Sequence, residues 1–139
     1  MTTRIGLRVA GAFFLALCIG ANAQGATPED DARAFLGHLD AGRYEESWVE
    51  TAGFVQASTK KEEWAAAMAS LREVKGEPAE RRFSHKELTF EFPDGPSGQY
   101  ITLVYATTFT GRPKQAEVLH LYLEADGRYR VAGYGFKKD

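Results

Sequence analysis

The spacing of hydrophobic residues in this chain changes at Pro78, and this change limits the folds that the chain can adopt. Before Pro78, apolar side chains recur with the period of an amphipathic helix. After Pro78, they tend to alternate with polar ones, and β-branched and aromatic residues become frequent, which indicates strands. A helical half followed by a strand-forming half predicts an α+β domain, with helices packed on one face of an antiparallel sheet.

Three helices are expected in the first half of the domain. The first begins at Thr27, a capping residue followed by a proline suited to the first turn, and ends at Gly42. A short second helix spans 44–48 and carries two aromatic residues one turn apart. The third begins at Thr59, three residues before a glutamate, and ends at Gly76. Its tryptophan is expected to pack on the sheet as part of the core.

Four antiparallel strands are expected after Pro78, separated by turn-forming residues. They are Arg81–Phe92, Tyr100–Phe109, Glu117–Glu124 and Arg128–Phe136. The alternation of the first strand slips near Ser84–His85, which indicates a β-bulge. In the third strand, period two places the leucines 119, 121 and 123 on one face, which we expect the helices to cover.

The first 23 residues have the pattern of an export signal. A short basic start precedes an apolar run at 9–20, and Ala21–Ala23 provides the small residues that a signal peptidase requires. The run is shorter than the ~20 residues that span a bilayer, so we expect cleavage and no stable membrane insertion. The sequence therefore predicts a signal peptide at 1–23 and a single domain at 24–139, which would work in the periplasm or be secreted.

The single cysteine of the chain, Cys18, lies inside this signal. Cleavage near Ala23 would leave the mature domain without a disulfide or a thiolate nucleophile. The alternative is that 15–18 forms a lipoprotein box and Cys18 is lipidated. The large Leu17 before the cysteine argues against that alternative, because such boxes favour a small residue there.

Charge and motif content argue against several function classes. The chain has 17 Lys and Arg against 19 Asp and Glu, without the basic patch that nucleic-acid binding requires. The three histidines, His38, His85 and His120, form no pair at a metal-ligand spacing, so neither a metal nor a cofactor is predicted. Ser84 and His85 are neighbours on an expected strand and should point to opposite faces, which would prevent a nucleophile–base pair.

The acidic residues do not suggest a catalytic group, and no catalytic residue is predicted. Glu117 and Glu124 stand at the ends of an expected strand, where we expect them to face water. Arg81 and Arg82 fit a solvated sheet edge, with an anion-binding patch as the alternative.

An ordered set of short motifs gives the chain a family resemblance. It carries, in this order, Ala34-Phe35-Leu36, Ser47-Trp48, Arg81-Arg82, Pro93-Asp94-Gly95, Tyr105-x-Thr107-x-Phe109 and Asp126-Gly127-x-Tyr129-x-Val131-x-Gly133-Tyr134. This set resembles the exported bacterial domain of unknown function 4019 family, although Tyr129 stands where a tryptophan is more usual. The resemblance implies a cone-like fold of the nuclear-transport-factor-2 type, with a curved sheet, and it implies no activity.

The resulting functional expectation is an exported, non-catalytic binding or interaction domain. Its partner would be a protein or a small apolar ligand, with Tyr105, His120 and Tyr122 as candidate ligand-binding residues. The resemblance also suggests a homodimer through the open sheet face that carries His120 and Tyr122. The alternative is a small isomerase- or hydrolase-like enzyme that uses the cone interior, where a carboxylate would act beside a tyrosine hydroxyl.

Overall fold

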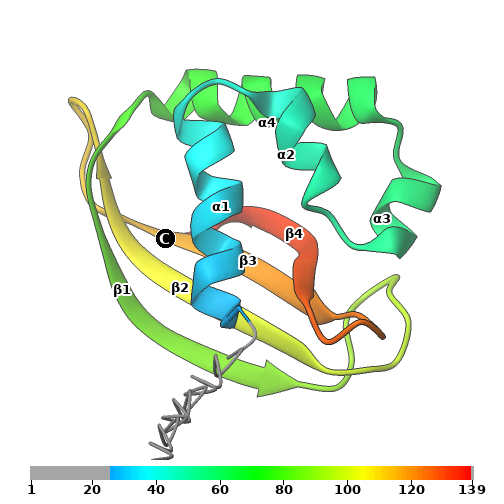
Figure 1. Cartoon of the computed structure of the whole chain (residues 1–139). Coiled ribbons are helices and arrows are strands. Elements are labelled where there is room, and N and C mark those ends of the chain that lie inside the picture. Colours follow the sequence, from blue (N-terminus) through cyan, green and yellow to red (C-terminus); the bar gives the residue numbers. More distant parts are fainter. Residues whose placement is uncertain (1–25, 139) are drawn as a thin grey trace, which may run out of the picture.

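Four antiparallel strands form one open sheet that curves around helix α1 (Figure 1). The structure is a computed structural model that describes residues 26–138. The elements are α1 (Pro28–Asp40), α2 (Tyr44–Val49), α3 (Gly53–Ser58), α4 (Lys61–Lys75), β1 (Pro78–Thr89), β2 (Tyr100–Phe109), β3 (Gln115–Leu123) and β4 (Tyr129–Phe136). The strands lie in the order β1-β2-β3-β4, so the predicted α+β class with a four-stranded antiparallel sheet is confirmed.

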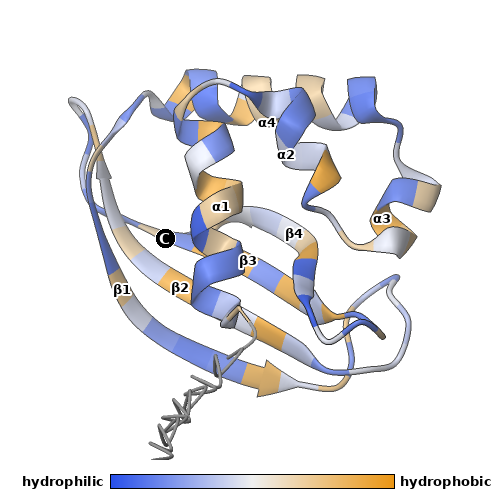
Figure 2. Ribbon diagram, in the orientation of Figure 1, coloured by the Kyte–Doolittle hydropathy of each residue, from blue (hydrophilic) through white to orange (hydrophobic). Residues whose placement is uncertain are grey.

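The strands follow the prediction closely, and the bounds of β1 differ most from it. The bounds of β2 are those predicted, whereas β1 begins at Pro78 and ends at Thr89, three residues earlier at each end than expected. The predicted bulge is present, because the pairing of β1 with β2 shifts register between Phe83 and His85. Figure 2 shows β1 as the most hydrophilic of the four strands, in keeping with its place at the sheet edge.

The helical half contains four helices rather than three. At the start of α1, Thr27 Oγ1 accepts a hydrogen bond from the Asp30 amide at 3.2 Å, and the Asp30 carboxylate accepts one from the Thr27 amide at 3.3 Å. Helix α4 begins one residue later than the predicted capping box, since Glu63 accepts from the Lys60 amide at 3.3 Å. Helix α3, six residues long, was not predicted, because so short a segment offers neither a cap nor a repeating period.

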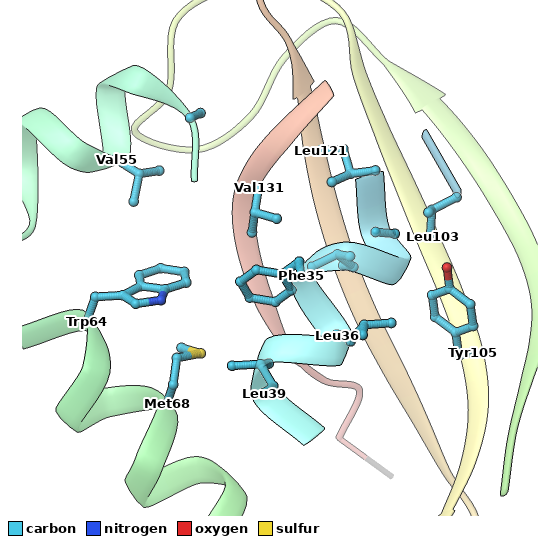
Figure 3. Close-up of a cluster of buried hydrophobic side chains, with 13 residues drawn as sticks. Phe35, Leu36, Leu39, Val55, Trp64, Met68, Leu103, Tyr105, Leu121 and Val131 are labelled. Atoms are coloured by element: carbon cyan, nitrogen blue, oxygen red, sulfur yellow. The ribbon is translucent and has the colours of Figure 1, made fainter. Parts of the chain in front are cut away.

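The core lies between α1 and the concave face of the sheet. Figure 3 shows Phe35, Leu36 and Leu39 of α1 in one cluster with side chains of β2, β3 and β4. Leu119 and Leu121 are wholly buried beneath the helices, as predicted, and Leu123 is half-buried. Burial of such side chains stabilises the fold by about 1.5–3 kcal/mol each.

Trp64 of α4 is buried as predicted, but its partners are helices. The indole ring meets the ring of Phe35 edge to face at 6.2 Å, and its Nε1 donates to the buried Ser47 hydroxyl at 3.0 Å. Trp64 therefore joins α4 to α1 and α2, within the same buried cluster as Leu103, Leu121 and Val131 of the sheet.

The connection between α2 and α3 is tied to the last strand. Thr51 forms a parallel bridge with Val131 of β4, in which the Ala52 amide donates to the Val131 carbonyl at 2.8 Å. The Val131 amide donates in turn to the Glu50 carbonyl at 2.9 Å. These bonds cover part of the outer edge of β4. Within residues 26–138, no helix combines the length and apolar character needed to cross a membrane.

Candidate functional site

A pocket of about 510 Å³ opens between α1 and the first two strands of the sheet. It is lined by Glu29, Arg33, Leu36, Gly37 and Asp40 of α1, and by Arg81, Phe83 and Tyr105 of the sheet. Small-molecule sites usually have volumes of about 300–1,000 Å³, so the pocket is of a suitable size for a small ligand.

The apolar wall of the pocket is made by Leu36, Phe83 and Tyr105. Phe83 and Tyr105 are paired across β1 and β2, and their rings meet edge to face at 5.9 Å. Figure 3 shows Leu36 on α1 facing the strand that carries Tyr105. Phe83 keeps 51% of its surface exposed, because α1 covers the middle of the sheet and leaves β1 open. An aromatic side chain on the wall of a pocket is a contact surface for an apolar ligand.

Gly37 keeps the helical wall of this pocket open. A Cβ atom built on Gly37 would meet nothing within 4 Å, so no packing contact within the described chain requires a glycine there. A glycine inside a helix is less stable than an alanine by roughly 0.5–1 kcal/mol. The structural effect of Gly37 is empty space on the pocket side of α1.

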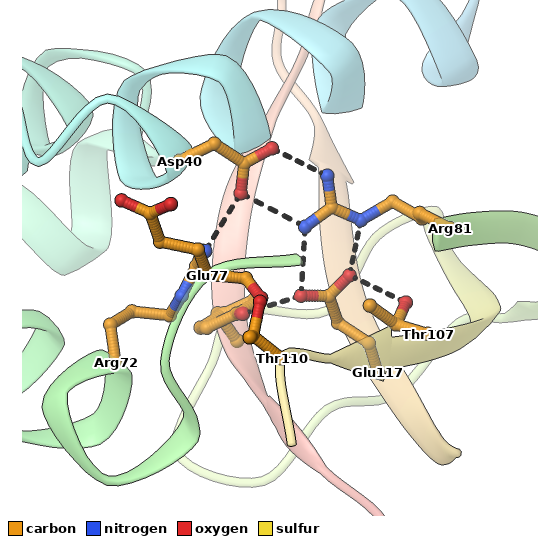
Figure 4. A network of polar contacts seen from close by, with 8 residues as sticks. Asp40, Arg72, Glu77, Arg81, Thr107, Thr110 and Glu117 are labelled. Atoms are coloured by element: carbon orange, nitrogen blue, oxygen red, sulfur yellow. Dashed lines mark hydrogen bonds and ion pairs between the residues drawn. The ribbon is translucent and has the colours of Figure 1, made fainter. Parts of the chain in front are cut away.

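A network of buried charges forms the polar end of the pocket (Figure 4). The guanidinium of Arg81 donates to both oxygens of Asp40 at 2.6 and 3.0 Å and to both oxygens of Glu117 at 2.5 and 3.1 Å. Arg72 of α4 donates to the same Asp40 carboxylate at 2.8 Å. Two arginines thus face two carboxylates, and the network has no net charge.

Two expectations from the sequence were wrong at this network. Glu117 was expected to face water, yet it is wholly buried and also accepts from the hydroxyls of Tyr134 at 2.6 Å and Thr107 at 3.1 Å. Arg81 was expected at a solvated edge, yet it points into the concave face of the sheet. The missed signal is strand parity, since Glu117 lies two residues before the buried Leu119 and shares its face.

The network fixes the ionisation states of Asp40 and Arg81. Burial raises the pKa of the Asp40 carboxyl, but hydrogen bonds from Arg81 and Arg72 outweigh it and hold that pKa below its ordinary value. Burial lowers the pKa of Arg81, but its bonds to Asp40 and Glu117 outweigh this and raise the pKa. Asp40 therefore stays ionised at neutral pH and is a weak base toward a bound molecule.

The remaining charges at the mouth of the pocket are also paired. Lys86 donates to Glu29 at 2.7 Å and thereby joins β1 to the first turn of α1. Arg33 donates to Asp30, one turn earlier on the helix, at 3.0 Å. The hydroxyl of Tyr105 makes no hydrogen bond within residues 26–138. Burial raises the pKa of Tyr105, so this hydroxyl keeps its proton at neutral pH.

The three candidate ligand-binding residues do not line one common pocket. Tyr105 lines the pocket on the concave face, and His120 lines a groove on the outer face. Tyr122 packs against Phe54 of α3, with ring centroids 5.7 Å apart, and against the buried core. His120 Nδ1 is 2.8 Å from Thr102 Oγ1, and the ring of Phe92 lies 5.1 Å from the imidazole. Burial lowers the pKa of His120, with a smaller opposing effect of Glu87.

The loop between β1 and β2 covers one end of the outer face. Phe92 of this loop stacks on Tyr100 at 5.2 Å, and the Tyr100 hydroxyl donates to the Pro96 carbonyl at 2.6 Å. Beyond the loop, a shallow groove of about 460 Å³ passes over Gly133 and Gly135. The chain's own loop therefore provides part of the cover that was expected from a second subunit.

The bulge in β1 brings Ser84 and His85 to the same side, contrary to the sequence prediction. Ser84 Oγ lies 3.0 Å from His85 Nδ1, and His85 Nε2 lies 3.4 Å from Glu87 Oε1. All three residues are exposed, and the hollows that Ser84 and Glu87 line, of about 240 and 460 Å³, are open to solvent. The same part of the chain contains no group of three His, Cys, Asp or Glu side chains that could hold a metal ion.

Comparison with known proteins gives a family and no closer relative. No curated protein matches the chain, and no solved structure matches it. The family model described as "Protein of unknown function (DUF4019)" matches residues 31–134, a segment that extends from α1 to β4 and includes Asp40, Arg81 and Glu117. The chain belongs to the DUF4019 family of proteins of unknown function.

Proposed function

We propose that this protein is an exported, non-catalytic binding domain that holds a small, largely apolar ligand between α1 and strands β1 and β2. The observation that carries the proposal is a pocket of about 510 Å³ with an apolar wall that the chain does not cover. Phe83 stays half exposed there, and Gly37 leaves room opposite it. A chain that needed only a stable core would gain by filling this space.

The ionisation states favour binding over the enzymatic alternative. An isomerase- or hydrolase-like site would need a carboxylate able to take a proton beside a hydroxyl donor. Asp40 and Tyr105 do line one pocket, but two arginines hold the pKa of Asp40 below its ordinary value. Glu117 does not line the pocket, and its two oxygens already accept hydrogen bonds from Arg81, Thr107 and Tyr134.

Export and the cone-like fold are two further parts of the proposal. The pattern at 1–23, which lies outside the described residues, supports export with cleavage near Ala23. The curved sheet around α1 is consistent with a cone of the nuclear-transport-factor-2 type. In such a cone, the proposed ligand would lie at the open side of α1, toward β1.

A homodimer through the outer sheet face is the second part of the interaction proposal. The observation in its favour is the groove over Gly133 and Gly135, beside His120, which the loop between β1 and β2 leaves open. Sedimentation of the mature protein at micromolar concentration tests it. A dimer that Gly135→Leu dissociates would support this interface, whereas a monomer at all concentrations would exclude it.

Filling the pocket tests the ligand-binding proposal directly. Gly37→Leu places a side chain in the open space of α1 and removes a helix-destabilising glycine, so the variant should fold. Gly135→Leu is the matched control, because a Cβ atom there also meets nothing within 4 Å, while Gly135 lines the groove on the outer face. The probe is N-phenyl-1-naphthylamine, an uncharged aromatic amine whose fluorescence increases in apolar surroundings.

We expect the wild type and Gly135→Leu to bind this probe, and Gly37→Leu to lose at least tenfold in affinity. Equal binding by all three proteins would place the probe elsewhere and contradict the proposal. Loss of binding in Gly135→Leu alone would transfer the ligand site to the outer face.

A further inference from the structure

We infer that the pocket selects an uncharged ligand with a hydrogen-bond acceptor, such as a ketone or ester carbonyl, and that the Tyr105 hydroxyl donates to this acceptor. The inference rests on the proposed function and assigns it a ligand class. Within residues 26–138, the charged groups around the pocket have partners, whereas the Tyr105 hydroxyl has none.

The charged groups of the pocket already have partners. Asp40 and Arg81 bind each other and are also bound to Arg72 and Glu117 deeper in the fold. At the mouth, Glu29 is bound to Lys86 on β1. A charged ligand would therefore have to displace an existing ion pair or remain without a counter-ion in a partly desolvated site, and both are unfavourable.

Tyr105 supplies the pocket with a hydrogen-bond donor that has no partner within the described residues. The residue is 91% buried, and its ring meets that of Phe83 edge to face, which fixes the direction of the C–O bond. The hydroxyl oxygen makes no hydrogen bond within residues 26–138. It is also not among the buried polar atoms that lack a partner there, so it remains accessible on the pocket side. A phenol that faces an apolar pocket gains from an acceptor on the ligand, and a ligand without one leaves the hydroxyl unsatisfied.

Arg33 is the group of the pocket most able to bind an anionic ligand instead of an uncharged one. Its side chain is 78% exposed, and its bond to Asp30 joins two residues on the same helix surface. Such surface pairs are weak and exchange readily with solvent. A ligand carboxylate held by Arg33 is therefore the outcome against which the inference must be tested.

Three naphthalenes of nearly equal shape separate these cases. They are 2-acetylnaphthalene, a neutral ketone; 2-isopropenylnaphthalene, in which a CH₂ group replaces the carbonyl oxygen; and 2-naphthoate, a carboxylate. Binding is followed by two-dimensional amide NMR, with the Gly37 amide as the reporter of the pocket. We expect the ketone to bind about fivefold more tightly than the alkene, which corresponds to one net hydrogen bond. The carboxylate should bind no more tightly than the alkene.

Tyr105→Phe is the decisive variant, because it removes one oxygen atom and keeps the ring. In this variant, the ketone should lose its advantage while the alkene keeps its affinity. Tyr44→Phe is the matched control, since Tyr44 lies on α2 outside the pocket lining, and it should preserve the advantage.

Four results would overturn the inference, and the last of them would also overturn the proposed function. Equal binding of ketone and alkene in the wild type, or an advantage that persists in Tyr105→Phe, would show that the hydroxyl does not recognise the ligand. Tightest binding of 2-naphthoate, lost in Arg33→Gln, would assign the pocket to anions. If none of the three compounds shifted the Gly37 resonance, both the ligand class and the binding pocket would be wrong.

Discussion

Arg81 of β1 forms a two-point ion pair with Glu117 of β3 across the intervening strand β2, with N–O distances of 2.5 and 3.1 Å. The carboxylate is wholly buried, while the guanidinium also reaches the wall of the pocket. The pair therefore links the interior of the sheet to the surface that a ligand would contact. Any change in Glu117 is transmitted to the pocket through the position of Arg81.

Replacement of Glu117 should destabilise the domain strongly. Glu117→Gln leaves Arg81 with one counter-ion instead of two and leaves two buried hydroxyls, of Thr107 and Tyr134, with an altered acceptor. We expect a loss of about 3–5 kcal/mol in the free energy of unfolding, measured with urea. Glu87→Gln, on the exposed outer face, should change it by less than about 0.5 kcal/mol. Similar losses in the two variants would contradict the buried network.

Gly37, inside α1, and Gly42, just after this helix, should respond in opposite directions to the same substitution. Gly37→Ala lies inside α1 with open space around it and should stabilise the domain by roughly 0.5–1 kcal/mol. Gly42→Ala lies just after the helix at a φ of +72°, where alanine is strained by roughly 1–2 kcal/mol, and should destabilise it. Thermal unfolding of both variants measures the difference. A fall in melting temperature for Gly37→Ala would mean that the space beside α1 is not open.

Removal of the Trp64 side chain should cost about 3–5 kcal/mol, a large share of the stability of a domain of this size. The indole fills the space between three helices, and its loss also removes the donor to the buried Ser47 hydroxyl. Chemical unfolding of Trp64→Ala, with Trp64→Phe as the milder variant, measures this loss. A melting temperature within one or two degrees of the wild type would instead show that Trp64 is exposed.

Stability should decrease as the pH falls below about 6.5, in part because of His120. Burial lowers the pKa of His120 in the folded protein, so the unfolded chain binds the proton more tightly. The contribution of the neutral ring is fully present above the unfolded pKa of about 6.5 and is lost as the pH falls from there toward the lowered pKa. Urea midpoints at pH 7.5, 6.5 and 5.5 should therefore fall more steeply for the wild type than for His120→Gln. Parallel curves would show that His120 titrates normally.

Export should leave Gln24 as the first residue of the mature protein. Cleavage after Ala23 would keep Thr27, whose hydroxyl and amide complete the capping box of α1, so the helix start is preserved. Mass spectrometry of the exported protein gives the terminus. A lipidated Cys18 at the terminus would indicate a tethered lipoprotein, and an intact Met1 would rule out both forms of processing.

The helices and strands were predictable where local signals agree. Strand β2 was predicted with its observed bounds, because a turn region precedes it and Gly111 follows it. The burial of Glu117 was not predicted, since hydropathy ranks glutamate as a surface residue and gives no information about a distant arginine. Its shared parity with Leu119 was the available signal, and burial becomes plausible only once Arg81 is known to lie on the same face.

The candidate site was harder to predict than the fold, because it depends on register and on space. Tyr105 was a candidate, but its pairing with Phe83 requires the register of β1 on β2. The bulge changes which residues of β1 share a face and brings Ser84 beside His85, which simple alternation excludes. The pocket depends in part on Gly37, which has no side chain to fill it. Hydrophobic periodicity does not predict such an empty volume.

The bridge between Thr51 and Val131 has a consequence for how the chain acquires its structure during synthesis. The segment that joins α2 to α3 emerges early, but its backbone partner lies 80 residues later, near the end of the chain. The sequence separation is larger still for Asp31, whose carboxylate accepts a hydrogen bond from the Tyr129 amide. The helical half cannot complete its contacts until the last strand arrives, and such long-range closure slows folding. A nascent chain would therefore complete its fold only after β4, its last strand, has been synthesised.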